Sequence, residues 1–136
     1  MGKEKVVLID TSSWIEALRS TGRPDVRNKV GNLMIDGSAA WCDMVAVELW
    51  NGARGAYERQ KLSELQEEII CLETTPEVWQ TARLLAQRCR EAGQTVPSAD
   101  LVITACALAN NAEIEHRDSH IGLILKVHRG EKRKGL

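Results

Sequence analysis

Short runs of apolar residues alternate along this chain with longer segments in which apolar residues recur every three or four positions. The apolar run that begins at Val6 predicts a buried strand over Val6–Asp10, and the further strand candidates are residues 39–42, 69–72, 112–116 and 122–127. The longer segments between them have the spacing of amphipathic helices. Alternating strands and helices predict an α/β domain with a central parallel sheet.

Capping and stop residues mark where the helices should begin and end. Ser13 and Glu16 have capping-box spacing, so a helix is expected just after the first strand. A Glu-, Gln- and Leu-rich surface helix is expected over residues 57–68. The expected starts of the other helices are Pro24, Asp43, Pro76 and the Pro97-Ser98 pair.

The composition fits one globular domain. The chain has 136 residues, of which 43% are hydrophobic and 27% charged, which leaves room for a real core. A net charge of −1 gives no overall basic field, so any nucleic-acid binding must come from local patches. We expect a single domain over residues 1–127, followed by a basic, frayed tail over residues 128–136.

The N-terminal segment and the cysteines bear on the compartment. Residues 1–5 lead into only four apolar residues, too few for a signal peptide or a membrane span, so we expect a cytoplasmic protein without membrane contact. The cysteines lie far apart in apolar stretches and predict buried free thiols rather than disulfides or a zinc site. They are Cys42, Cys71, Cys89 and Cys106.

Four carboxylates stand where the predicted elements can bring them together. Asp10 ends the first strand, Asp118 follows residues 112–116, Glu48 lies on the apolar face of a helix, and Asp100 lies in the first turn of another. Ligands of open parallel sheets bind beyond the carboxyl ends of the strands. Ionised carboxylates are rarely buried alone, and no matching set of cations accompanies these. The set therefore predicts a site for a divalent metal ion.

Each carboxylate also has an ordinary structural interpretation. Asp10 can cap a helix, although the hydroxyl residues that follow it can do so too. Glu48 can form a buried salt bridge, Asp100 can interact with the helix macrodipole, and Asp118 can begin a turn. Convergence of all four on one edge of the sheet favours a functional site. His116 and His120 flank Asp118 and could bind a metal ion or transfer a proton, but this i, i+4 pair spans a strand–turn junction and so lacks the geometry of a zinc pair on one helix.

Four segments of the chain resemble the PIN-domain ribonucleases, in particular the VapC-type toxins of toxin–antitoxin pairs. They appear in the family's order and together span nearly the whole chain. The segments are Val7–Ile15, Val45–Ala53, Pro97–Ala105 and His116–Ile121. The resemblance implies a three-layer α/β/α fold around a central parallel sheet. It also implies an endoribonuclease that depends on Mg²⁺ or Mn²⁺ and hydrolyses RNA phosphodiester bonds.

The resemblance also assigns roles to individual residues. By matching position, Asp10, Glu48, Asp100 and Asp118 form the acidic catalytic and metal site, and Ser12 matches a hydroxyl that orders it. We expect Asp10 and Asp100 to be direct or near-direct metal ligands. Glu48 and Asp118 would position waters or a second ion.

The resemblance further implies partners. These are an RNA substrate, a second copy of the chain in a homodimer, and a cognate antitoxin that lays an Arg across the carboxylates. The helical surfaces near Trp50 and Trp79 are the candidate dimer contacts, and the basic tail is expected to hold RNA phosphates. Two alternatives stay open. One is a catalytically idle PIN fold used as a binding module, and the other is a phosphoacceptor signalling domain.

Overall fold

Four short strands form one parallel sheet in the order β3-β2-β1-β4. The structure is a computed structural model that describes residues 5–134, with side chains described to residue 130. β1 pairs in parallel with β2 on one side and β4 on the other, so Val7 lies opposite both Ala39 and Glu113. The strands are β1 (Val7–Ile9), β2 (Ala39–Cys42), β3 (Ile70–Leu72) and β4 (Glu113–Glu115).

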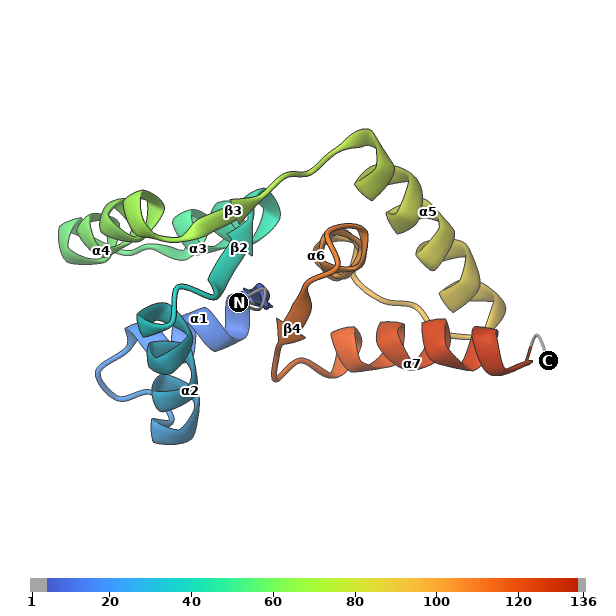
Figure 1. The fold of residues 1–136 in the computed structure, drawn as a ribbon, viewed down its shortest axis with the longest axis horizontal. Helices are drawn as coiled ribbons and strands as arrows, with labels where there is room; N and C mark the ends of the chain where they lie inside the picture. The colour runs from blue at the N-terminus through green and yellow to red at the C-terminus, as the bar shows by residue number, and fades with distance from the viewer. Residues whose placement is uncertain (1–4, 135–136) are drawn as a thin grey trace.

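Helices cover both faces of the sheet. Figure 1 shows α1 to α4 to the left of the strands and α5 to α7 to the right, which confirms the predicted three-layer α/β/α fold with a central parallel sheet. This division follows from right-handed crossovers, because the chain crosses the sheet in one direction up to β3 and then returns to β4. The helices are α1 (Thr11–Leu18), α2 (Pro24–Ile35), α3 (Asp43–Gly52), α4 (Ala56–Glu68), α5 (Pro76–Glu91), α6 (Ser98–Ala109) and α7 (Ser119–Lys134).

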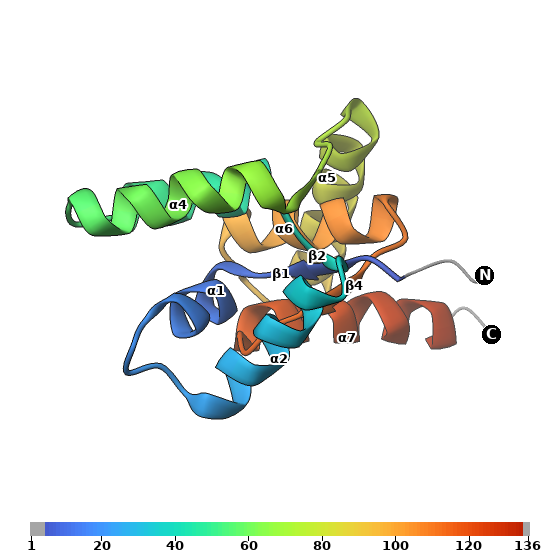
Figure 2. The same ribbon diagram turned by 60° about the vertical axis from the view of Figure 1, so that its left-hand side comes forward.

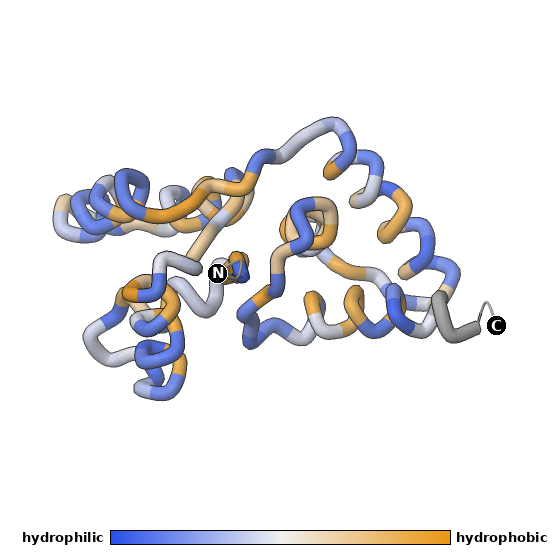
Figure 3. The backbone as a smooth tube through the Cα atoms, in the orientation of Figure 1, coloured by the Kyte–Doolittle hydropathy of each residue, from blue (hydrophilic) through white to orange (hydrophobic). Residues whose placement is uncertain are grey.

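Helix α6 forms the centre of the right-hand layer. Every residue from Leu101 to Ala107 is buried, and α6 packs against both α5 and α7. Hydropathy follows this arrangement, because hydrophobic positions gather along α6 and the strands β1 to β3, whereas hydrophilic positions recur along β4, α2, α4 and α5 (Figure 3). Helix α4 projects from the left-hand side of the molecule in both ribbon views (Figures 1 and 2). The most buried helix therefore carries Asp100, at its first turn.

The tryptophans divide between core and surface. Trp14 and Trp41 are buried and meet edge to face, with ring centroids 6.3 Å apart. Trp50 is half-buried, and its Nε1 donates a hydrogen bond to Gln66 at 2.7 Å. Trp79 on α5 is 45% exposed. Of the two tryptophans near the expected dimer contacts, Trp79 is therefore the more accessible.

The last predicted strand is wrong, because residues 122–127 lie within helix α7. Ile121 and Ile124 are fully buried and stand three positions apart, which is helical rather than strand spacing. Helix α7 also continues through residues 128–134, so the backbone there is helical where the sequence predicts a frayed tail. Residues 135–136 of the tail lie outside the described residues. The domain boundary after residue 127 and the role of the tail in RNA binding stay predictions.

The cysteines follow the prediction with one exception. All four are free thiols, and Cys42, Cys89 and Cys106 are buried. Cys71 is exposed, because it lies on β3 at the edge of the sheet, where no further strand covers it. Across the described residues, no helix combines the length and the apolar character needed to cross a membrane.

Candidate functional site

The carboxyl ends of β1 and β4 lie beside each other, and the chain leaves them toward opposite faces of the sheet. β1 leads into α1 in the left-hand layer, and β4 leads to α7 in the right-hand layer (Figure 1). Open α/β sheets bind ligands at such a point. A cavity of about 370 Å³ lies there. It is lined by Asp10, Thr11, Ser12, Ile15, Glu48, Pro97, Ala99, Asp100, Ile103, Asp118 and His120. The structure thus brings together all four carboxylates and Ser12.

Asp10 is both a helix cap and a cavity residue. Its side chain is almost fully buried, and Oδ1 accepts a hydrogen bond from the backbone N–H of Ser13 at 2.9 Å, which caps α1. The expected cap at Ser13 is therefore wrong, because the helix begins two residues earlier. Oδ2 accepts a hydrogen bond from the Ser12 hydroxyl at 2.9 Å. Burial raises the pKa of the Asp10 carboxyl, and the hydrogen bonds from Ser13 and Ser12 oppose that rise.

Glu48 is held by a hydroxyl rather than by a cation. The Thr11 hydroxyl donates a hydrogen bond of 2.5 Å to Glu48 Oε1, which joins the first residue of α1 to the middle of α3. Among the described side chains, Glu48 forms no ion pair, so the alternative of a buried salt bridge is not observed. From the sequence, Thr11 was expected only as a possible helix cap. The one sign of its contact with Glu48 was a hydroxyl directly after Asp10.

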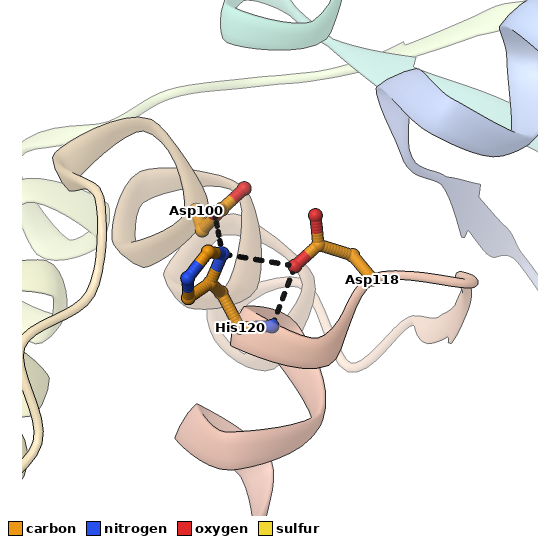
Figure 4. Close-up of side chains that lie close together, drawn as sticks. All are labelled: Asp100, Asp118 and His120. Atoms are coloured by element: carbon orange, nitrogen blue, oxygen red, sulfur yellow. Dashed lines mark hydrogen bonds and ion pairs between the residues drawn. The ribbon is translucent and has the colours of Figure 1, made fainter.

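Asp100, Asp118 and His120 line the cavity and lie close together (Figure 4). Asp118 precedes α7, and its Oδ1 accepts hydrogen bonds from the backbone N–H groups of His120 at 2.7 Å and Ile121 at 3.0 Å. The Nδ1 atom of His120 lies 3.7 Å from Asp100 Oδ2 and 3.7 Å from Asp118 Oδ1. One ligand atom from each of the three residues lies within 4.8 Å of the other two.

The carboxylates repel one another across the cavity. The pKa of Asp100 is raised to about 6, first by burial and then by the negative charges of Asp118, Glu48 and Asp10, while His120 opposes the rise. Within the described residues, no Lys or Arg forms an ion pair with any of the four. Oxygen donors with uncompensated charge fit a hard divalent cation, so the residues present agree with a metal site.

The cationic side chain nearest in sequence to Asp118 forms its ion pairs outside the cavity. Arg117 precedes Asp118, yet its guanidinium pairs with Asp25 at 3.2 Å and lies 3.9 Å from Glu115. Lys29 also pairs with Glu115, at 3.3 Å. These pairs join β4 and the loop after it to α2, and they leave the charge of the cavity uncompensated.

A comparison with protein families places the chain in one of them. The model of the PIN domain family matches residues 7–124, and the chain belongs to that family. Among its relatives, ribonuclease VapC11 of Mycobacterium tuberculosis (strain ATCC 25618 / H37Rv) is 31% identical over 126 residues. That alignment covers 90% of this chain and 93% of the relative.

Solved structures with the same fold come from toxin–antitoxin systems. VapBC-1 from nontypeable Haemophilus influenzae superposes with a TM-score of 0.71 at 18% identity, covering 89% of this chain and 93% of that one. A toxin–antitoxin complex from Klebsiella pneumoniae has a TM-score of 0.68 at 16% identity, covering 85% and 88%. At these identities the structures show only that the fold is shared. Membership of the family is shown by the family model and by the sequence relatives.

Proposed function

We propose that this protein is a metal-dependent endoribonuclease that hydrolyses RNA phosphodiester bonds as the toxin of a toxin–antitoxin pair. The observation that carries the proposal is the convergence of four carboxylates from separate elements in one cavity, with no Lys or Arg among the described side chains paired to them. Kinship with a ribonuclease over nearly its whole length supports the same activity.

The chain's own residues would divide the work as follows. Asp10 and Asp100 would hold a Mg²⁺ or Mn²⁺ ion, and Ser12 would fix the orientation of the Asp10 carboxylate. Glu48 and Asp118 would position waters or a second ion, because a hydroxyl and backbone amides already fix one oxygen of each. The bound ion would act as a Lewis acid. It would lower the pKa of a bound water molecule and stabilise the negative charge that develops on the phosphodiester.

The test is cleavage of a fluorophore-labelled single-stranded RNA by the purified full chain. We expect cleavage with Mg²⁺ or Mn²⁺, none in excess chelator, and loss of activity in Asp10→Asn and Asp100→Asn. Asp36→Asn, an exposed carboxylate outside the cavity, is the matched control and should cleave normally. Full activity in chelator, or near-normal turnover in Asp100→Asn, would contradict the assignment.

The same assay separates the two alternatives. An idle binding module would bind RNA without cutting it. A phosphoacceptor domain would use a Lys beside its acids, and among the described residues no Lys lines the cavity. We favour the nuclease because, among the described residues, no Lys or Arg lines the cavity, so its carboxylates call for a divalent metal ion as their counter-charge.

Two protein partners belong to the proposal. One is a cognate antitoxin that places an Arg across the uncompensated carboxylates, where a guanidinium can bond two carboxylate oxygens at once. The other is a second copy of the chain. Trp79 and Leu84 of α5 are 45% and 46% exposed, and large exposed apolar side chains on one helix favour a contact that covers them. We assign the dimer contact to this helix rather than to Trp50.

A further inference from the structure

His120 lies in the acidic cavity, yet no hydrogen bond of its ring to either neighbouring carboxylate is present. Its Nδ1 atom stands 3.7 Å from an oxygen of Asp100 and 3.7 Å from an oxygen of Asp118. Both distances exceed the range of a normal N–H···O hydrogen bond. Figure 4 shows the ring turned toward the two carboxylates. The nitrogen therefore faces the space between two oxygen donors without being bonded to either.

We infer that His120 Nδ1 is an imidazole ligand of the divalent cation and biases the site toward first-row transition ions, Mn²⁺ among them, over Mg²⁺. The inference rests on the proposed function, because it concerns the same cation. Mg²⁺ takes oxygen ligands almost exclusively, whereas imidazole nitrogen is a good ligand for transition metals. One nitrogen among carboxylates thus changes which ion the site prefers.

The spacing of the donor atoms supports a shared ion. The three candidate atoms, from Asp100, Asp118 and His120, lie within 4.8 Å of one another. Ligands on opposite sides of an ion with bonds of 2.0–2.6 Å stand about 4–5 Å apart. The three atoms thus fit within the coordination sphere of one ion, which would make Asp118 a direct ligand beside Asp100 and not only a residue that positions waters.

A purely structural role does not explain the ring. The contribution of His120 to α7 comes from its backbone, whose N–H donates to Asp118 Oδ1 and needs no imidazole. The side chain is 44% exposed, so the core does not need it for packing. His116 differs, because its Nδ1 accepts a hydrogen bond from the backbone N–H of Asp118 at 3.4 Å. His116 is therefore the natural comparison for any histidine effect.

Pulsed electron paramagnetic resonance of bound Mn²⁺ detects a directly bound histidine nitrogen. With Mn²⁺ alone as the probe, the full chain should show that nitrogen coupling. The chain holds three histidines, so His116→Ala, His120→Ala and His128→Ala assign the signal completely. We expect loss of the coupling in His120→Ala and retention in the other two. A wild-type spectrum without nitrogen coupling, or a coupling that survives in His120→Ala, overturns the inference.

Affinities measured by calorimetry give a second readout that does not depend on RNA cleavage. His120→Ala should weaken Mn²⁺ binding about 10- to 100-fold and change Mg²⁺ binding far less. His120→Asp offers an oxygen ligand instead, so it should still bind metal and should lower the preference for Mn²⁺ over Mg²⁺. Equal losses for both ions in His120→Ala, or an unchanged preference in His120→Asp, overturn the inference.

These outcomes separate the inference from the function on which it rests. A chain that binds Mn²⁺ with His120 coordination yet cuts no RNA in any divalent ion refutes the nuclease and leaves the ligand assignment intact. A chain that cuts RNA without a histidine nitrogen on its Mn²⁺ refutes the ligand assignment and leaves the nuclease intact.

Discussion

Replacing Asp100 by Asn should stabilise the metal-free protein at neutral pH. The Asp100 side chain is only 15% exposed and stands at the start of α6, where burial and the charges of Asp118, Glu48 and Asp10 raise its pKa to about 6. A carboxylate that is harder to ionise in the fold than in the unfolded chain opposes folding wherever it is charged. Asn keeps nearly the same shape and removes that charge.

The magnitude follows from the two pKa values. A folded-state pKa of about 6, against an ordinary value of 3.8, corresponds to about 3 kcal/mol, because each pKa unit is worth about 1.4 kcal/mol. That pKa is a net value, so it already includes the favourable interaction of the charged form with the N-terminus of α6. The expected gain in the free energy of unfolding is therefore at most about 3 kcal/mol when Asp100 is fully ionised.

The pH dependence has a definite sign. The unfolded chain releases this proton near pH 3.8 and the folded chain near pH 6, so the folded state binds more protons between these values. The free energy of unfolding of the wild type therefore falls as pH rises through this window and stays lower above it. The advantage of Asp100→Asn should be near zero below pH 4, grow between pH 4 and 6, and level off above pH 6.

Urea unfolding in excess chelator, at a series of pH values from 4 to 8, measures this difference. Asp36→Asn, which changes an exposed carboxylate outside the cavity, should show little pH-dependent difference from the wild type. Saturating Mn²⁺ should reverse the order, because the wild type gains binding energy that the variant has lost. A variant no more stable than the wild type at pH 8 without metal, or equally more stable at pH 4 and 8, would refute the electrostatic reasoning.

Two further substitutions test the contacts described above. Thr11→Val removes the hydroxyl that holds Glu48 while keeping the side-chain shape, so we expect kcat for RNA cleavage to fall about tenfold with KM little changed, and Thr11→Ser to restore it. An unchanged kcat in Thr11→Val would show that the hydrogen bond has no part in activity. Trp79→Glu places a charge on the exposed face of α5, so light scattering should report a monomer in place of a dimer. A dimer that persists in this variant contradicts the assigned contact.

Strands β1, β2 and β3 were predictable because each one is a compact apolar run. β1 is buried along its whole length and β2 likewise, and both appear in the sequence as unbroken apolar segments. The same rule failed at residues 122–127, because a short apolar run looks alike in a buried strand and on the inner face of a helix. Only the packing of α7 against α5 and α6 decides between the two structures, and local sequence does not show tertiary packing.

The site was predictable where it depends on the ends of strands, but not where it depends on how helices pack. Asp10 and Asp118 could be placed because strand ends converge in any parallel sheet. The bond between Thr11 and Glu48 could not, because it joins residues 37 positions apart whose approach depends on how α1 and α3 pack. The position of His120 depends likewise on where α7 begins relative to α6. The sequence pattern predicted a strand over residues 122–127, where the structure has this helix.

Structural and functional interpretations of these carboxylates turn out not to compete. Asp10 caps α1 and Asp118 accepts the first backbone amides of α7, so the fold uses one oxygen of each as a helix cap. Such hydrogen bonds satisfy lone pairs and fix orientation, but they add no countercharge. The Thr11 hydroxyl likewise holds one oxygen of Glu48 without adding a countercharge. Three of the four carboxylates are thus oriented before any ion arrives, and the charge of the cavity is left for a cation to neutralise. A cap residue whose second oxygen faces a shared cavity is therefore a stronger sign of a metal site than a carboxylate held by Lys or Arg.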